Sequence, residues 1–311
     1  MLTFLAITEL GSVACPIIGR ITFVPVKVVV GVQIAVHQMT SGVDPRKNVA
    51  DMTATIAAAA EAGAIMYFAP EMSVLLNRNR AEATAKITSE SASTALAQLR
   101  DCARDTGLWV HLGSMAVHDE GDSKLANRTV VINPQGEIQA RYDKIHLFDV
   151  SLESGESWCE SSAYNAGTQP VIVDTPLGLM GLAICYDMRF PDLFSAYAKA
   201  GVGVLTLPSA FTVPTGEAHW HSLLRARAIE SGSFVIAAAQ CGLHADGRKT
   251  YGHSLVVDPW GHVLLDMGIN PGLGLVDLDL GRIADVRAQI PVHANRQPIS
   301  APLVLGTNGV K

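Results

Sequence analysis

The sequence predicts an α/β fold, and two observations lead to that prediction. Short apolar runs alternate along the chain with helical patterns, as they do in layered α/β domains. In addition, 49% of the 311 residues are hydrophobic and only 17% are charged, which provides enough apolar material for a large core. Neither an internal repeat nor a low-complexity linker interrupts this alternation. Because large α/β sandwiches reach this size as one unit, we expect a single domain over residues 26–300.

Strands are predicted where short apolar runs are rich in β-branched residues. In chain order they lie at residues 26–39, 64–69, 109–117, 128–133, 137–142, 179–185, 202–207, 234–240 and 254–258. Pro134-Gln135-Gly136 and Pro259-Trp260-Gly261 have the composition of turns between neighbouring strands.

Helices are predicted where apolar residues recur at helical spacing, at residues 48–62, 91–104, 193–200 and 220–231. In the first of these, Val49, Met52 and Ile56 share one face, and Gly63 follows as a stop signal.

The two ends of the chain are predicted to lie outside the core, as an extension over residues 1–25 and a tail over residues 301–311. The start of the chain is apolar, but it lacks a basic segment, and Glu9 interrupts the apolar stretch, so it does not match a signal peptide. Glu9 and Arg20 also break any run of about 20 apolar residues, the length that a membrane span requires. We therefore expect no membrane partner.

Charge and cysteine content exclude two further classes of protein. The net charge is −6 and no run is rich in Lys or Arg, so the chain has no general attraction for nucleic acid. Its five cysteines form no C-x-x-C pair, and an odd number does not suit a disulfide framework. Free thiols fit a reducing compartment, and we expect the protein to be cytoplasmic.

Three reactive side chains lie at or just past the ends of predicted strands. Glu71 follows the strand 64–69, Lys144 follows 137–142, and Cys185 ends 179–185. In α/β folds, active groups gather where strands end and loops begin. Taken singly, each residue also fits a structural role: an exposed loop glutamate, a solvated lysine and a buried inert cysteine.

Together these three residue types can perform nucleophilic catalysis. A cysteine attacks as its thiolate, which near neutral pH requires a neighbouring base or cation. We expect Glu71, directly after an apolar strand, to be partly desolvated, and a desolvated carboxylate can act as that base. The Lys144 ammonium can stabilise a developing oxyanion.

Other chemistries have little support. The pair His219-x-His221, with His253 further along the chain, is a weak metal pattern without an accompanying C-x-x-C, so we predict no metal. The sequence lacks G-x-S-x-G, G-x-G-x-x-G after a strand, and G-x-x-x-x-G-K-[ST]. A serine hydrolase and a nucleotide cofactor therefore have no motif behind them, and we predict no cofactor.

Three motifs in order resemble those of the nitrilase, or carbon–nitrogen hydrolase, superfamily. They are Phe68-Ala69-Pro70-Glu71-Met72-Ser73, Tyr142-Asp143-Lys144-Ile145-His146-Leu147-Phe148-Asp149 and Ile184-Cys185-Tyr186-Asp187-Met188-Arg189-Phe190-Pro191. The similarity runs from about Val28 to Pro298, and the pattern of residues resembles most the branch containing deaminated-glutathione amidase and omega-amidase.

The resemblance implies an αββα four-layer sandwich and the hydrolysis of a small carboxylated amide to acid and ammonia through a thioester. It implies that Cys185 is the nucleophile, Glu71 the base, and Lys144 and the backbone N–H of Tyr186 the oxyanion donors. Glu160, in Trp158-Cys159-Glu160-Ser161, resembles the second glutamate of the family, which supports the lysine. The resemblance also implies a homodimer or a higher homo-oligomer.

Substrate contacts are expected from five side chains near the third motif and beyond it, namely Arg189, Phe211, Thr215, His219 and Trp220. Arg189 can meet a substrate carboxylate through two hydrogen bonds, or it can pair with Asp187 or Asp192 instead.

The same site chemistry also fits an omega-amidase, a nitrilase or a carbamoylase. A scaffold that keeps the fold without turnover is the alternative from another class, although such a protein has no need of the complete set Glu71, Lys144 and Cys185.

Overall fold

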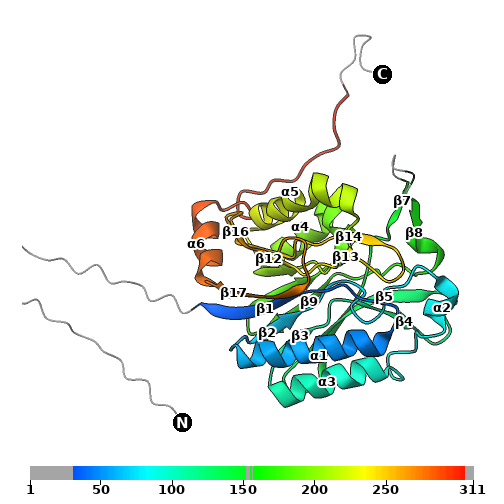
Figure 1. Ribbon diagram of the computed structural model, residues 1–311. Coiled ribbons are helices and arrows are strands. Elements are labelled where there is room, and N and C mark those ends of the chain that lie inside the picture. Colours follow the sequence, from blue (N-terminus) through cyan, green and yellow to red (C-terminus); the bar gives the residue numbers. More distant parts are fainter. Residues whose placement is uncertain (1–30, 152–154, 156, 305–311) are drawn as a thin grey trace, which may run out of the picture. The chain divides into compact units, whose positions relative to one another are not determined.

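Two mixed β-sheets lie face to face in this computed structural model, which describes residues 31–151, 155 and 157–304 (Figure 1). The first sheet has the order β17-β1-β2-β3-β5-β4, with β6 also paired to β5. Its strands are β1 (Val32–Gln38), β2 (Met66–Phe68), β3 (Trp109–His111), β4 (Met115–His118), β5 (Leu125–Ile132), β6 (Ile138–Asp143) and β17 (Gly272–Leu278).

The second sheet has the order β16-β15-β12-β11-β10-β9. Its strands are β9 (Val171–Thr175), β10 (Gly178–Leu182), β11 (Val204–Thr206), β12 (Phe234–Ala237), β15 (Leu255–Val257) and β16 (Val263–Asp266). Two separate hairpins pair β7 (Asp149–Ser151) with β8 (Ser157–Cys159), and β13 (Cys241–Leu243) with β14 (Lys249–Tyr251).

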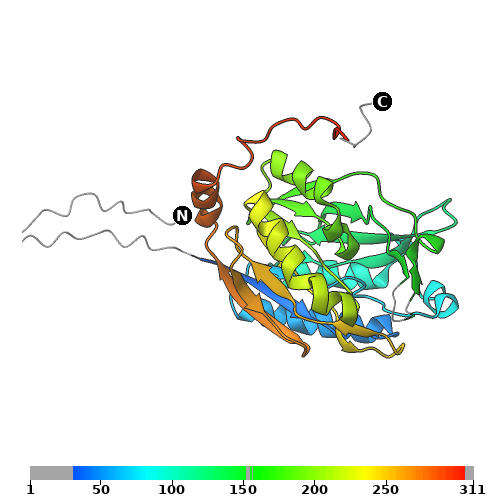
Figure 2. The ribbon, with the colours of Figure 1, turned by 90° about the horizontal axis from the view of Figure 1, so that it is seen from above.

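Helices cover the outer face of each sheet. The described residues contain α1 (Pro45–Glu61), α2 (Arg80–Thr84), α3 (Thr94–Thr106), α4 (Pro191–Lys199), α5 (Val213–Ser231) and α6 (Gly281–Gln289). Helices α1 and α3 lie side by side beneath the first sheet, and α4 and α5 lie on the second (Figure 1). Figure 2 shows the molecule from above, with α5 in yellow-green on the side nearest the viewer.

The pleat of strand β1 explains how the sheets bury both faces. Ile34 and Val36 belong to the core between the sheets, whereas Ala35 belongs to the core beneath α1 and α3. Side chains alternate between the faces of a strand, so a continuous apolar run is needed where both faces are covered. The expected αββα four-layer sandwich is confirmed by this layering and by the solved structures described below.

Most predicted elements occur, with shifted bounds. The segment expected as one strand over residues 109–117 is divided into β3 and β4. The helix expected over residues 220–231 begins seven residues earlier, at Val213, with Pro214 in its first turn. The predicted extension, residues 1–25, lies outside the described residues. Residues 301–304 are exposed and have neither helix nor strand.

Several elements had no prediction, because their sequences are short or rich in glycine. The strand β17, with the sequence GLGLVDL, pairs antiparallel with β1 and completes the first sheet. In the part of the chain that the structure describes, no helix is both long enough and apolar enough to cross a membrane.

Candidate active site

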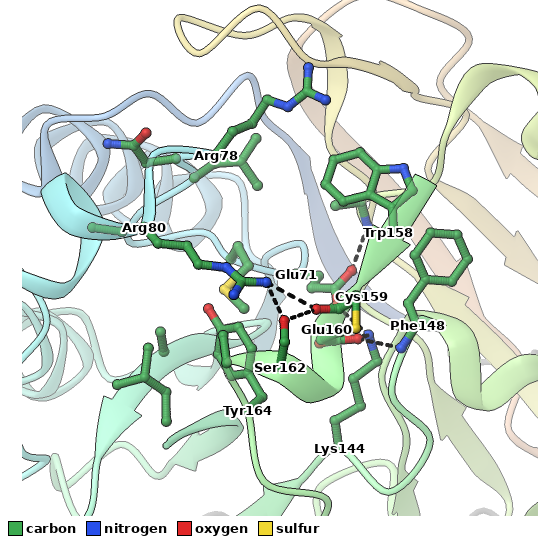
Figure 3. Close-up of a pocket in the computed structure, with 18 of the residues that line it drawn as sticks. Glu71, Arg78, Arg80, Lys144, Phe148, Trp158, Cys159, Glu160, Ser162 and Tyr164 are labelled. Carbon is green, nitrogen blue, oxygen red and sulfur yellow. Dashed lines mark hydrogen bonds and ion pairs between the residues drawn. The ribbon is translucent and has the colours of Figure 1, made fainter. Parts of the chain in front are cut away.

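Three strand ends of the two sheets meet at one cavity of about 580 Å³. Glu71 follows β2, Lys144 follows β6, and Cys185 follows β10. All three side chains line the cavity and are buried. The sequence prediction that strand ends would bring these residues together therefore agrees with their positions in the fold. Figure 3 shows Glu71, Lys144 and Glu160 at the base of this cavity.

The loop that carries Glu71 is fixed by close contact with the turn between β3 and β4. Ser114 donates its backbone N–H to the carbonyl of Pro70 at 3.2 Å, and its hydroxyl accepts a hydrogen bond from the N–H of Met72 at 3.1 Å. Gly113 has a φ of 78°, and a Cβ there would lie 1.9 Å from the Pro70 carbonyl oxygen. Only glycine permits this approach, so the position of Glu71 depends on it.

Cys185 lies at a sharp turn between β10 and a short 3₁₀ helix, Cys185–Arg189. Its φ of 46° is in the left-handed region, where a non-glycine residue pays about 1–2 kcal/mol. A hydrogen bond of 3.0 Å from its backbone N–H to the Pro208 carbonyl helps to hold this conformation. Strained backbone of this kind is typical of functional turns, and it resembles the nucleophile elbow of other hydrolases.

Lys144 joins the two glutamates of the site. Its Nζ lies 3.0 Å from Oε1 of Glu71 and 2.9 Å from Oε2 of Glu160, and only 2% of its side chain is exposed. Burial alone lowers the pKa of Lys144, but the charges of Glu160 and Glu71 outweigh burial and raise the pKa well above its usual value. The lysine is therefore a fixed cation.

The two carboxylates are held by further donors. Asn127, on β5, donates to Oε1 of Glu71 at 3.0 Å and to Oε1 of Glu160 at 3.2 Å. The backbone N–H of Ala210 donates to Glu71 at 2.9 Å, and that of Phe148 donates to Glu160 at 2.7 Å. Sequence analysis did not predict Asn127, whose place next to Lys144 follows from the pairing of β5 with β6.

Burial and two neighbouring charges act on the pKa of the Cys185 thiol, and not all in the same direction. Burial raises its pKa well above the usual range, and the negative charge of Glu71 raises it further, whereas Lys144 acts in the opposite direction. The side chain thus lies in one site with Glu71 and the Lys144 ammonium. Such a set can move the thiol proton to the carboxylate while the ammonium stabilises the negative charge that forms.

A family model described as carbon–nitrogen hydrolase matches residues 33–288. The chain belongs to the carbon–nitrogen hydrolase family. It is 42% identical over 271 residues to the deaminated glutathione amidase of Homo sapiens, covering 85% of this chain and 82% of that protein. This similarity to amidases, together with the family match, identifies an enzyme that hydrolyses amides.

Solved structures give the same result for the fold of this carbon–nitrogen hydrolase. The NitFhit protein of C. elegans has a TM-score of 0.79 and 39% identity, over 86% of this chain and 65% of that chain. A mutant of the amidase from Nesterenkonia sp. AN1 has a TM-score of 0.70 and 29% identity, over 84% of this chain and 98% of that chain. That amidase structure contains the result of a Michael addition of acrylamide at its active-site cysteine.

Asp187 connects the Cys185 turn of this hydrolase to the segment after Lys144. Its side chain is fully buried. It accepts hydrogen bonds from the Tyr142 hydroxyl at 2.7 Å and from the backbone N–H groups of His146 and Ile184 at 3.0 and 2.8 Å. Sequence analysis considered Asp187 only as a partner for Arg189. In the structure, Asp187 fixes the positions of the second and third motifs relative to each other.

Of the five predicted substrate contacts, two line the cavity and three do not. Phe211 and Thr215 lie in its wall. Arg189 lies 5.4 Å from the Phe211 ring centroid, with its Nη2 3.3 Å from Nδ1 of His219, and neither Arg189 nor His219 is among the described cavity residues. Trp220 is fully buried and donates its indole N–H to the His253 carbonyl, so it belongs to the core. A substrate role for these three side chains stays a prediction.

The cavity also contains residues that the sequence motifs did not indicate. Three arginines and one tryptophan line it, namely Arg78, Arg80, Arg248 and Trp158. Arg78 and Arg80 come from the segment before α2 and its first residue, Trp158 from β8, and Arg248 from the turn between β13 and β14. Trp158 lies two residues before Glu160, in a segment that the family resemblance already includes, whereas the three arginines lie outside the quoted motifs and reach the site only through the fold.

Two of the histidines considered as metal ligands, His221 and His253, lie together in the structure, and their candidate ligand atoms and that of Asp266 are all within 4.8 Å of one another. His221 and His253 each lie within 2.9 Å of one carboxylate oxygen of Asp266, and His219 does not join them. Each imidazole therefore has a carboxylate partner, and this group lies apart from the residues that line the cavity.

Proposed function

We propose that Cys185 is the nucleophile of this amide-hydrolysing enzyme, with Glu71 as general base and acid. One observation carries the proposal: a buried ammonium, that of Lys144, lies between two carboxylates in the cavity that Cys185 also lines. The cysteine that reacts with acrylamide in the related amidase supports the same assignment. A non-catalytic scaffold gains nothing from two buried charges, those of Lys144 and Glu71, with the partly buried Glu160 beside them, because such charges are costly to desolvate.

In the proposed reaction, Glu71 accepts the thiol proton as the sulfur of Cys185 attacks the amide carbon. The tetrahedral oxyanion is stabilised by the Lys144 ammonium and the backbone N–H of Tyr186. When the C–N bond breaks, Glu71 returns the proton to the leaving nitrogen, and an acyl thioester remains on Cys185. A water molecule then gives its proton to Glu71 and attacks the thioester, which releases the acid and restores the thiol. Glu160 holds Lys144 in position throughout.

The substrate is proposed to be a small amide with a carboxylate, and deaminated glutathione in particular. The amidases that carry this name are 36–43% identical to the chain. Three arginines in the cavity wall favour an anionic substrate. Deaminated glutathione contains only secondary amides, so its hydrolysis at the keto-acyl end releases an amine, cysteinylglycine. The ammonia expected from the sequence requires a primary amide instead.

A substrate panel tests this assignment. We expect the highest kcat/KM for deaminated glutathione when compared with α-ketoglutaramate, glutamine, propionamide, butyronitrile and an N-carbamoyl amino acid. Products are measured by mass spectrometry, and the Cys185→Ala variant provides the background rate. A higher kcat/KM for α-ketoglutaramate moves the assignment to an omega-amidase, and one for the nitrile or carbamoyl compound moves it to those chemistries. Folded protein that acts on none of the panel contradicts the proposal and favours the scaffold alternative.

We also propose that the enzyme is a homodimer or a higher homo-oligomer that packs through α4 and α5. This rests on the family resemblance and on Ile229 of α5, which is 49% exposed. We expect Ile229→Asp to reduce the mass measured by light scattering, and Leu264→Asp, at a similarly exposed residue of β16, to serve as the control. A monomeric wild type rejects this proposal.

The compartment is proposed to be the cytoplasm, since the described cysteines are free thiols. Cell fractionation checks this proposal.

A further inference from the structure

Arg248 is a cavity residue whose charge is poorly compensated. It lies in the turn between β13 and β14, and 17% of its side chain is exposed. Its guanidinium carbon lies 4.6 Å from the centroid of the Trp158 ring, and both residues line the cavity. Burial lowers the pKa of Arg248 below its ordinary value, which is the effect expected of a cation that the protein has not fully paired.

The guanidinium of Arg248 has N–H donors that make no hydrogen bond within the described part of the protein. Its Nε is buried and has no hydrogen-bond partner among the described residues. The nearest carboxylate is Asp246, at an N–O distance of 3.6 Å, which is too long for a hydrogen bond. The two oxygens of Asp246 instead accept the backbone N–H groups of Arg248 and Arg78, at 2.9 and 2.8 Å. A buried unsatisfied donor is rare in native proteins and requires an explanation.

The other two arginines of the cavity differ from Arg248. The guanidinium of Arg80 donates to the carbonyl of Cys159 at 3.1 Å and to the hydroxyl of Ser162, so its hydrogen bonds are made within the protein. Arg78 is exposed, and its guanidinium carbon lies 5.2 Å from the centroid of the Trp158 ring that Arg248 also contacts. Figure 3 shows Arg78 beside Trp158, and Arg80 directed at Ser162. Arg248 alone of the three is a largely buried fork with donors to spare.

We propose that Arg248, whose guanidinium lies over the Trp158 ring, binds a carboxylate of the substrate and thereby selects dianionic amides over short neutral ones. The inference rests on the proposed hydrolysis at Cys185 and names a specificity determinant for it. A carboxylate matches the guanidinium fork through two parallel hydrogen bonds and supplies the acceptors that the protein does not. The cation–π contact with the indole limits the movement of the guanidinium. An amine or a neutral amide offers neither this geometry nor the compensating charge.

Replacing Arg248 with methionine is expected to lower kcat/KM for deaminated glutathione by about 10- to 100-fold, mainly through KM, because a charged hydrogen-bonded pair is lost. Arg248→Lys keeps the charge but not the fork, and should restore only part of the loss. Arg46→Met is the control, since Arg46 is a surface residue paired only with Asp44. Equal melting temperatures for the variants and the wild type show that folding is not the cause.

Two substrate analogues identify which carboxylate is bound, without depending on the variant alone. One carries a glycine carboxamide in place of the terminal carboxylate, and the other carries a butanoyl group in place of the keto acid. For the analogue that lacks the bound carboxylate, the wild type should lose the same 10- to 100-fold, and the ratio of wild type to Arg248→Met should approach one. If both analogues retain the full ratio, Arg248 binds neither carboxylate and the inference is overturned.

Calorimetry separates this inference from the proposed function. Deaminated glutathione is titrated into Cys185→Ala, with and without Arg248→Met, because binding does not require turnover. Binding that weakens at least tenfold in the double variant supports the inference even if the wild type fails to hydrolyse the compound. Hydrolysis with equal binding by both proteins supports the proposed function and rejects the role of Arg248. Absence of binding to Cys185→Ala rejects it as well.

Discussion

Cys185→Ala is expected to abolish amide hydrolysis, with a fall in kcat of roughly 10⁴-fold or more, because no covalent intermediate can form. The backbone at this position is left-handed, with a φ of 46°, and alanine adopts it no more easily than cysteine. The stability of the variant should therefore be close to that of the wild type. The loss of rate is measured on deaminated glutathione, or on whichever amide of the panel is hydrolysed fastest.

Intact-mass spectrometry gives an independent measurement of the same assignment. Iodoacetamide should add one label fewer to Cys185→Ala than to the wild type, and peptide mapping should place the missing label at Cys185. Cys241→Ala is the matched control, since Cys241 is also buried but is not among the residues that line the cavity. A Cys185→Ala protein with normal turnover, or loss of turnover in Cys241→Ala alone, contradicts the assignment.

Lys144→Met is expected to affect both rate and stability. The rate should fall by about 10²–10³-fold because an oxyanion donor is lost. The free energy of unfolding should fall by about 3–5 kcal/mol, because the Glu71 and Glu160 carboxylates remain buried without their cation. Both quantities are measured on one preparation, by steady-state kinetics and by urea denaturation.

A second variant separates the two effects. Adding Glu160→Gln to Lys144→Met removes one of the uncompensated charges, so part of the stability should return while the rate stays low. Lys47→Met is the control, because Lys47 is exposed on α1 and is not among the residues that line the cavity. Full activity in Lys144→Met, or stability equal to the wild type, is incompatible with this account of the site.

The sequence predicts the positions of Glu71, Lys144 and Cys185 well, because each follows an apolar strand whose end is visible in the pattern. Their partners are harder to predict. Asn127 lies within the strand β5, and it meets both glutamates only because β5 pairs with β6. Asp187 is polar and fully buried, and its role is apparent only when the loops that it joins are placed in space.

The position of Trp220 could not be predicted from the sequence, because the helix that carries it begins seven residues earlier than expected. The helix starts at Val213, and Trp220 shares its buried face with Leu224 and Ala228, four and eight residues later. Helical spacing then directs the side chain into the core.

The two small hairpins of the fold carry side chains of the cavity wall, separately from the strands that lead to Glu71, Lys144 and Cys185. Glu71, Lys144 and Cys185 extend from strands of the two large sheets, whereas Trp158 and Arg248 are carried by β7-β8 and by the turn of β13-β14, which pair with neither sheet. Substitutions in a short hairpin disturb little of the core. A descendant of this gene can therefore acquire a new substrate by changing these hairpins, while the chemistry of bond cleavage is inherited unaltered.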